Sequence, residues 1–262
     1  MKAIILSAGQ GRRLLPLTDA TPKCALSVAG KTLLEWQLNE IGQCAIDEVV
    51  VVTGFGADQV DAIARAAHLA RVRTLYNPFY ALSDNLGTCW VASREMEEPF
   101  MLINGDTLFE SAILERLLGT GAEAPVTLVT DRKDHYDADD MKVIVDGDRL
   151  CRVGKSLTDG VNGESIGMMA FRGEGPGLFR DTVARLMRYG EGVKRWYLSA
   201  IDELAQQQRV DVCNIHGLSW CEVDEAEDLA HAHQVVTAWP RLERLDKRAN
   251  GSHDPASRQA AS

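Results

Sequence analysis

The sequence predicts an α/β fold with a Rossmann-like, predominantly parallel mixed sheet flanked by helices. Short apolar runs alternate with helical patterns through the first half of the chain, as they do when helices cover both faces of a parallel sheet. The first run leads directly into a glycine-rich loop, and ligands of open α/β sheets bind beyond the carboxyl ends of the strands. The chain is 45% apolar and 25% charged, a composition typical of a protein that buries a core.

Strands and helices are expected in alternation up to about residue 131. Each expected strand is a short run rich in Val, Ile and Leu, and the intervening segments space their apolar residues at helical intervals. The expected strands are residues 3–8, 48–54, 72–77, 100–105 and 126–131. The expected helices lie near residues 32–42, 57–68, 86–96 and 110–118.

The rest of the chain has a different pattern, which begins with a hairpin at 141–155 that has Asp146 and Gly147 at its turn. We expect a single domain over residues 1–240 and a disordered polar tail over 241–262. Further strands are expected at 164–171, 210–215 and 220–224, with helices near 176–188, 197–207 and 226–239.

Charge and cysteine content exclude several classes of partner. The net charge of −10 at pH 7 argues against nucleic acid or an anionic membrane, because either would favour a basic surface. No apolar run approaches the length of a membrane span, and the apolar start is too short for a signal peptide. The six cysteines are scattered without a CxxC pair, so neither a zinc site nor a disulfide framework is indicated. We therefore expect reduced thiols and a cytoplasmic location.

The loop after the first strand contains Gly9 and Gly11. Glycines there let backbone N–H groups approach phosphate oxygens, although a tight turn alone would need the same residues. A dinucleotide-binding fingerprint would require a third glycine where Leu14 stands. The Gly-Lys-Thr at residues 30–32 imitates a P-loop, but Ala25 stands where the earlier glycine is needed. The lysine of that tripeptide is expected in a turn.

The glycine loop continues as the pattern GxGxRLxPLTxxxPK over residues 9–23. This pattern resembles the signature of the nucleotidyltransferases that join a nucleoside triphosphate to a phosphorylated sugar or alcohol and release pyrophosphate. Within that superfamily the chain resembles most the phosphocholine cytidylyltransferase-like branch, whose loop commonly reads AAG or SAG. The resemblance covers roughly residues 1 to 235, through NPFYALSDNLGTCW, INGDTLF, DADDMKV, VGK, GESIG and CEVD. It implies a sheet of the nucleotide-diphospho-sugar transferase type, with an NTP-binding half (about 1–131) and an acceptor-binding half (about 132–240).

The reaction implied by this resemblance is attack of a phosphate or phosphonate oxygen on the α-phosphorus of the NTP. A phosphate monoester has its second pKa at about 6 and is largely a dianion at neutral pH, so no general base is required. The reaction instead requires positioning and charge neutralisation, because two anions must meet. The resemblance assigns Arg13 to the β- and γ-phosphates and Lys23 to the α-phosphate as catalytic cations. Arg12 matches no position of the signature and is expected to face solvent.

Two aspartates match the metal-binding positions of the family. Asp106 follows an apolar strand in INGDTLF, and Asp224 ends another short strand in CEVD. Either aspartate alone would more often cap a helix than bind a metal. Among phosphates, however, a carboxylate is repulsive unless a cation such as Mg²⁺ intervenes. The resemblance therefore implies Mg²⁺ as cofactor, and Glu222, two residues before Asp224, could assist.

The resemblance places nucleotide recognition in two segments. Leu6, Ala8 and Gly9, together with Gly11 of the same loop, match the positions that contact the nucleotide. Tyr80 and Asn85 align with residues that contact a pyrimidine in relatives, although Asn85 could equally cap the following helix. An asparagine suits cytosine and uracil alike, so CTP is preferred from the resemblance alone.

For the acceptor, Lys155 in RVGKSL aligns with a lysine that binds the acceptor's phosphate, and Lys142 is a weaker candidate. Glu164, with Gly167 in GESIG, matches a strand on which an acidic side chain meets an acceptor hydroxyl.

Aromatic residues could also form a cage for a quaternary ammonium through cation–π contacts. Trp196, Tyr197 and Trp90 are the candidates, and at least one of the adjacent pair Trp196 and Tyr197 is expected in the core. Sugar-phosphate, polyol-phosphate and phosphonate acceptors remain open.

The expected function is a CTP-dependent cytidylyltransferase that acts on small-molecule substrates and not on nucleic acid or membranes, with the oligomeric state left open. The alternative is a sugar-1-phosphate nucleotidyltransferase that uses UTP, dTTP or GTP. A non-catalytic nucleotide-binding regulator is disfavoured, because a sensor needs neither an α-phosphate lysine nor two metal carboxylates. An NAD-dependent oxidoreductase is weakened by Leu14.

Overall fold

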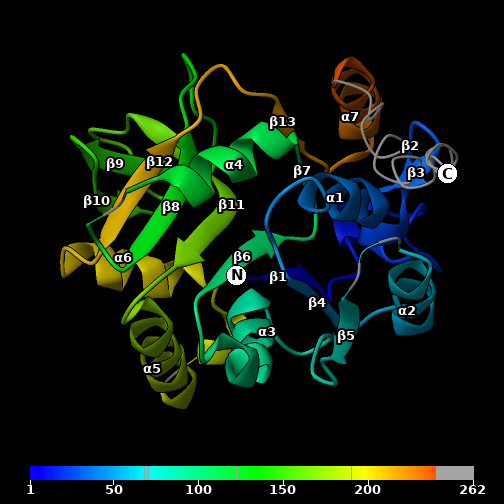
Figure 1. Cartoon of the computed structure of the whole chain (residues 1–262), viewed down its shortest axis with the longest axis horizontal. Coiled ribbons are helices and arrows are strands. Elements are labelled where there is room, and N and C mark those ends of the chain that lie inside the picture. Colours follow the sequence, from blue (N-terminus) through cyan, green and yellow to red (C-terminus); the bar gives the residue numbers. More distant parts are fainter. Residues whose placement is uncertain (68, 70, 122, 190, 240–262) are drawn as a thin grey trace, which may run out of the picture.

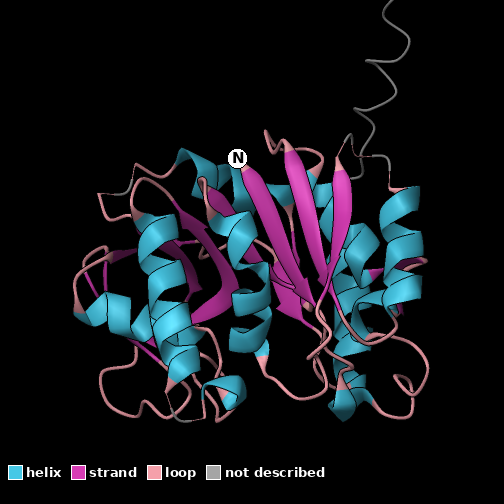
Figure 2. Cartoon of the chain, turned by 90° about the horizontal axis from the view of Figure 1, so that it is seen from below, coloured by secondary structure: helices cyan, strands magenta, loops and turns pink. Residues whose placement is uncertain are grey.

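A computed structural model describes residues 1–67, 69, 71–121, 123–189 and 191–239 (Figure 1). The tail expected over 241–262 lies outside the described residues. Within the described residues, strands from both predicted halves form one nine-stranded sheet in the order β5-β4-β1-β6-β11-β8-β12-β10-β9. Helices lie on both sides of the strands (Figure 2), which is the α/β architecture that the alternating pattern predicts.

The first part of the sheet is parallel. Strand β1 pairs in parallel with β4 on one side and with β6 on the other. β4 also pairs in parallel with β5. Ile4 of β1 aligns with Val50 and Leu102, all three fully buried, as expected of strands covered on both faces. These strands are β1 (Lys2–Ser7), β4 (Glu48–Thr53), β5 (Val72–Tyr76) and β6 (Phe100–Asn104).

The second part of the sheet contains the reversed strands. β11 runs antiparallel to both β6 and β8 and is buried along its whole length. β12 is parallel to β8, and β10 and β9 form an antiparallel hairpin whose β9 also pairs with the start of β11. These strands are β8 (Val126–Asp131), β9 (Lys142–Asp146), β10 (Arg149–Val153), β11 (Gly163–Phe171) and β12 (Val210–Asn214).

Each face of the sheet is covered by its own set of helices. One face carries α1 (Leu33–Ile41), α2 (Ala57–Ala66) and α4 (Ser111–Gly119), whose apolar residues share a core cluster with β1 and β4. The other face carries α3 (Asn85–Val91), α5 (Gly175–Arg188) and α6 (Leu198–Gln206).

A third, smaller cluster lies beside the main sheet. α7 (Ala226–Ala238) packs there against the short pair β7 (Thr107–Phe109) and β13 (Trp220–Glu222), and against the hairpin β2 (Ser27–Val28) and β3 (Lys31–Thr32). Among the described residues, no helix is both long and apolar enough to cross a membrane. Short 3₁₀ turns occur at Arg12–Leu14, Lys23–Ala25, Ala92–Met96 and Gly192–Lys194.

The expected strands and long helices are confirmed. The majority of their ends differ from the expected positions by no more than one or two residues. The prediction for the Gly-Lys-Thr tripeptide was wrong in detail. Lys31 lies in β3, and the turn falls one step earlier, at Ala29 and Gly30, which both have positive φ. The pairs β2–β3 and β7–β13 were missed because strands of two or three residues are too short to display a period.

Candidate active site

The loop after β1 folds back over Lys23. Gly11 has φ +77°, and a Cβ atom at Gly11 would lie 2.9 Å from the Cβ of Lys23, so only glycine allows this close approach. The Thr18 hydroxyl donates to the Gly11 carbonyl (2.8 Å), and the Gln10 amide donates to the Thr18 carbonyl (3.2 Å). The glycine-rich loop and the PK segment of the same motif therefore form one local unit.

Lys23 lies between two aspartates from distant parts of the chain. Its Nζ is 2.7 Å from Oδ2 of Asp106, just after β6, and 2.6 Å from Oδ1 of Asp224, just after β13. The Lys23 side chain is only 13% exposed. Burial alone would lower the pKa of Lys23, but the two carboxylates outweigh it and the pKa is raised, so the ammonium stays charged.

Arg13 extends the same cluster. Its guanidinium lies 2.8 Å from Oδ1 of Asp224 and 2.9 Å from Oδ2 of Asp139. Burial would raise the pKa of Asp224, but Lys23 and Arg13 lower it. The structure thus brings the two predicted catalytic cations and the two predicted metal ligands into one cluster.

The carboxylates of this cluster fit a divalent cation. Oδ1 of Asp106 is buried without a hydrogen-bond partner in the described part of the chain, which is costly for a carboxylate oxygen. Burial and the neighbouring Asp106 and Asp224 raise the pKa of Glu222 to about 8, which marks an excess of negative charge. The described residues contain no group of three or more side chains arranged to hold a metal. Two carboxylates nevertheless suit Mg²⁺, which usually keeps several waters and binds substrate phosphates.

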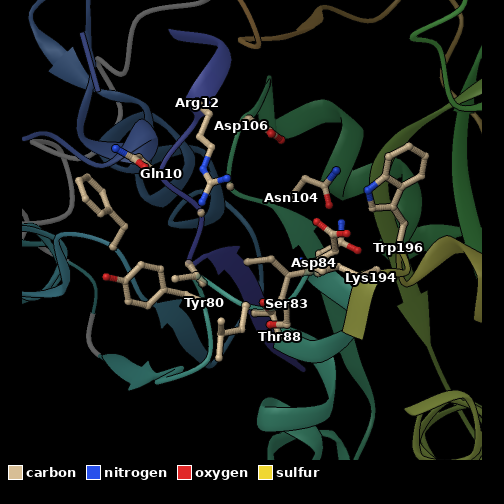
Figure 3. A pocket seen from close by; sticks show the side chains of 18 residues that line it. Gln10, Arg12, Tyr80, Ser83, Asp84, Thr88, Asn104, Asp106, Lys194 and Trp196 are labelled. Atoms are coloured by element: carbon tan, nitrogen blue, oxygen red, sulfur yellow. The ribbon is translucent and has the colours of Figure 1, made fainter. Parts of the chain in front are cut away.

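A cavity of 570 Å³ opens beside this cluster. It is lined by the loop after β1, by residues 80–85 and by the end of β6, and Asp106 forms part of its wall. Figure 3 shows Tyr80 on one side of the cavity and Trp196 on the other. The predicted nucleotide-binding residues that line it are Leu6, Ala8, Gly9, Tyr80 and Asn85. Because of these predicted residues we call it the nucleotide cavity.

Arg12 is exposed to solvent, as predicted, but it also contributes to the cavity wall. Figure 3 shows its side chain beside Asp106. The left-handed conformation of Gly11 turns the chain so that Arg12 faces the cavity while Arg13 pairs with Asp224.

Tyr197 positions two asparagines at the cavity wall. Its backbone N–H donates to Oδ1 of Asn85 (2.8 Å), and its hydroxyl donates to Oδ1 of Asn104 (2.9 Å). Because the Asn85 carbonyl accepts this bond, its NH₂ group is the part best placed to contact a ligand. Gly167 packs against the Asn104 side chain. It has φ +71°, and a Cβ atom there would lie 2.3 Å from Nδ2 of Asn104.

Of the three aromatic candidates for an ammonium cage, one of the adjacent pair lies in the core, as expected. Tyr197 is fully buried and belongs to the core. Trp90 is 46% exposed. It lines neither the nucleotide cavity nor a second cavity that adjoins it. Only Trp196 of the three candidates lies at the site.

Trp196 belongs to the wall between the nucleotide cavity and a second cavity of 570 Å³. We call this second space the distal cavity. It contains Lys155, whose Nζ lies 4.9 Å from the Trp196 ring centroid and 3.2 Å from Oδ1 of Asp139. Asp139 thereby links Lys155 to Arg13.

Two predicted acceptor residues lie outside both cavities. The buried Lys142 donates to the Lys155 carbonyl (2.8 Å), so it supports the loop that carries Lys155. Glu164 pairs with Lys133 (3.0 Å), and burial raises its pKa to about 7. Neither side chain lines the nucleotide cavity or the distal cavity.

Sequence reasoning missed Asn104, Asp139 and Lys194. Asn104 precedes Asp106 by two residues in INGD, so its place at the carboxyl end of a buried strand was a usable signal. Lys194, in the wall between the cavities, and Asp139, in an irregular loop, carry no local pattern.

Comparisons with known proteins show what this chain is similar to. The family model for the MobA-like NTP transferase domain matches residues 3–189. N-acetylmuramate alpha-1-phosphate uridylyltransferase from Neisseria meningitidis is 36% identical over 110 residues, which cover 41% of this chain and 48% of the relative. Choline-phosphate cytidylyltransferase from Streptococcus pneumoniae is 31% identical over 111 residues, covering 42% and 47%. The alignments thus span about half the length of these relatives.

Among solved structures, the inositol-1-phosphate CTP transferase from T. maritima superimposes with a TM-score of 0.77 at 20% identity, over 90% of this chain and 94% of that one. This similarity extends the shared fold well beyond the aligned sequence.

Proposed function

This chain belongs to the family of MobA-like NTP transferase domains, and we propose that it is a cytidylyltransferase. It would transfer CMP from CTP to a phosphate or phosphonate acceptor and release pyrophosphate. The observation that carries the proposal is the Lys23 ammonium held between Asp106, which lines the nucleotide cavity, and Asp224. A lysine and two carboxylates there match what the α-phosphate and a bound metal require.

The transfer is an in-line displacement at the α-phosphorus. An oxygen of the acceptor's dianion forms the new P–O bond, and the bond to the β-phosphate oxygen breaks as pyrophosphate leaves. Lys23 would stabilise the charge at the α-phosphoryl group, and Arg13 would hold the leaving phosphates. Arg12 faces the same cavity and would add a third cation for the triphosphate.

Asp106 and Asp224 are the residues that would hold Mg²⁺. When bound there, the ion would neutralise phosphate charge at the reacting centre. Its arrival would give the buried Oδ1 of Asp106 a partner and would free Lys23 from its present pairing with the two carboxylates.

The choice of CTP rests on relatives, and the nucleotide cavity is compatible with it. The Asn85 NH₂ group can donate to the carbonyl and ring nitrogen acceptors of cytosine, and Tyr80 lines the same cavity. A choline-phosphate cytidylyltransferase and an inositol-1-phosphate CTP transferase are similar to this chain. The substrates would be small molecules, and a cytoplasmic location suits them.

A sugar-1-phosphate nucleotidyltransferase that uses UTP is the second candidate. The uridylyltransferase from Neisseria meningitidis favours it, at 36% identity over its aligned part. Asn85 can contact O2 or O4 of uracil as well as cytosine.

Pyrophosphate release with Mg²⁺ across CTP, UTP, dTTP, GTP and ATP tests the proposal. Each NTP would be paired with inositol 1-phosphate, glucose 1-phosphate, glycerol 3-phosphate, phosphocholine and 2-hydroxyethylphosphonate. We expect release with CTP to exceed that with the other NTPs. Preference for UTP, dTTP or GTP with a sugar phosphate would favour the second candidate. A folded protein that binds nucleotide but releases nothing with any pair would contradict both.

A further inference from the structure

The distal cavity adjoins the nucleotide cavity and could receive the organic part of an acceptor. It is as large as the nucleotide cavity, at 570 Å³, and shares Lys194 and Trp196 with it. An acceptor whose phosphate points toward Lys23 would pass this shared wall. The charges around this wall therefore decide which organic groups of an acceptor can enter the distal cavity.

The charges that remain available around the shared wall are positive. Lys155, Lys194 and Arg195 line the distal cavity, and in the described part of the chain neither Lys194 nor Arg195 forms an ion pair with a carboxylate. Lys155 pairs only through the exposed Asp139, and such a contact contributes little.

The two carboxylates that line the distal cavity are already engaged. Both oxygens of Asp202 accept from Arg152, at 2.9 and 3.2 Å, and one also accepts from the backbone N–H of Val153. Glu203 pairs with Arg185. Binding a ligand cation there would require breaking these contacts.

The single aromatic side chain of the shared wall also has a cation beside it. The Nζ of Lys155 lies 4.9 Å from the centroid of the Trp196 ring, within the range of a cation–π contact. A quaternary ammonium brought to this ring would have to displace Lys155 or share the ring with it, and the two like charges would repel.

We propose that the organic group of the acceptor is an uncharged or anionic, oxygen-rich group such as a polyol, and that acceptors carrying an ammonium group are discriminated against. The proposal rests on the proposed function. The free polar groups around the wall are donors, namely the lysine and arginine nitrogens, and they match hydroxyl, carboxylate or phosphate oxygens.

Asp84 is a carboxylate near the shared wall that could favour a ligand cation. It lines the nucleotide cavity, and Figure 3 shows it near Lys194. It lies on the nucleotide side of the shared wall and does not line the distal cavity. Lys194 is therefore placed to offset its charge.

A pair of acceptors that differ only in charge provides the test. Phosphocholine and 3,3-dimethylbutyl phosphate have the same shape, but the second carries a neutral carbon in place of the ammonium nitrogen. With the preferred NTP and Mg²⁺, kcat/KM for the neutral compound should exceed that for phosphocholine by at least about tenfold. Inositol 1-phosphate or glycerol 3-phosphate should exceed both.

Charge reversal at the wall tests the cause. Lys194→Glu should lower the preference for the neutral compound by about tenfold or more. Arg188→Glu is the matched control, because Arg188 is an exposed cation at the end of α5 that lines neither cavity, and it should leave the ratio unchanged. A further variant, Asp84→Asn, should also leave phosphocholine disfavoured.

Equal or better use of phosphocholine by the natural protein would overturn this inference while leaving cytidylyl transfer in place. An unchanged ratio in Lys194→Glu would overturn it as well. Absence of pyrophosphate release with every acceptor would instead overturn the proposed function.

Discussion

Lys23 is the residue on which the proposed chemistry depends most. Its ammonium is buried and charged between two carboxylates, ready to move to an incoming phosphate. We expect Lys23→Ala to lower kcat by about 10²-fold or more, as loss of one charge-stabilising group does elsewhere. Steady-state pyrophosphate release measures this, and circular dichroism checks that the variant is folded.

Lys31→Ala provides the matched control for that variant. Lys31 is an exposed lysine in the β2–β3 hairpin, outside both cavities, so its removal should change kcat by less than about twofold. Near-normal kcat in Lys23→Ala would remove Lys23 from the reaction.

Asp106 carries the prediction for metal binding. Because its buried Oδ1 lacks a protein partner, we expect it to be a metal ligand. Asp106→Asn should raise the Mg²⁺ concentration for half-maximal rate by at least about tenfold, as the loss of one charged ligand would. An unchanged Mg²⁺ titration would exclude Asp106 from metal binding. Asp134→Asn, in an exposed loop outside the nucleotide cavity, is the control.

At this scale the motif predicted the cluster correctly but not every neighbour. Arg13, Lys23, Asp106 and Asp224 lie together because strand ends and a glycine loop place them at one edge of the sheet. The direction of Arg12 depends on the backbone of Gly11, which no spacing rule reports. The pairing of Glu164 with Lys133 joins a strand to a loop and leaves no local pattern.

At the level of elements, β11 is fitted closely to the end of β6. A Cβ at Gly167 would lie 2.3 Å from Nδ2 of Asn104, and Gly167 also has φ +71°. We expect Gly167→Ala to lower the free energy of unfolding by about 1–3 kcal/mol and to lower kcat/KM through displaced Asn104. Thermal unfolding and activity assays measure the two effects.

Gly177→Ala is the control for Gly167→Ala, because it replaces a glycine by alanine without creating a close contact. Gly177 lies in α5, and a Cβ there would meet no atom within 4 Å in the described part of the chain. Alanine should therefore raise the free energy of unfolding by about 0.5–1 kcal/mol. Equal behaviour of the two variants would contradict the close fit at Gly167.

The parallel edge of the sheet carries an ion network that predicts a dependence of stability on pH. Hydrogen bonds from Arg73 and Lys2 lower the pKa of Glu95 from 4.5 to about 2, against the effect of burial. The unfolded chain therefore binds a proton more readily, so this contribution is complete above about pH 4.5 and is lost as pH falls toward 2.

Glu95→Gln tests that dependence. Because the Arg73 side chain is 44% exposed, solvent screening limits the effect, and we expect a loss of about 1–2 kcal/mol at pH 7. Denaturant unfolding at pH 7 and pH 3 should show the difference from the natural protein shrinking at the lower pH. A constant difference, or an equal loss in the exposed control Glu98→Gln, would count against the network.

The predictability of elements followed their length. Strands such as β4 and β6 are uniform apolar runs bounded by polar or glycine residues, and they were predicted almost to the residue. The pairs β2–β3 and β7–β13 depend on contacts with α7 and its cluster, which the local sequence does not contain.

On the scale of the whole molecule, one continuous sheet carries both predicted halves. Lys23 and Asp224 are 201 residues apart in sequence, yet their side chains form a hydrogen-bonded ion pair at the site. The two cavities meet at Lys194 and Trp196, so the fold provides two adjoining spaces, as the proposed transfer between a nucleotide and an acceptor requires. The fold was predicted from the sequence, but the groups that line the wall between the cavities were not, because distant loops supply them.

The most direct test of nucleotidyl transfer is ³¹P NMR of the protein with Mg²⁺, CTP and a phosphorylated polyol. We expect the acceptor's monoester signal to be replaced by the paired doublets of a new P–O–P linkage, with one pyrophosphate formed for each linkage. Release of inorganic phosphate alone, or unchanged CTP and monoester signals with every acceptor and NTP, would contradict this expectation.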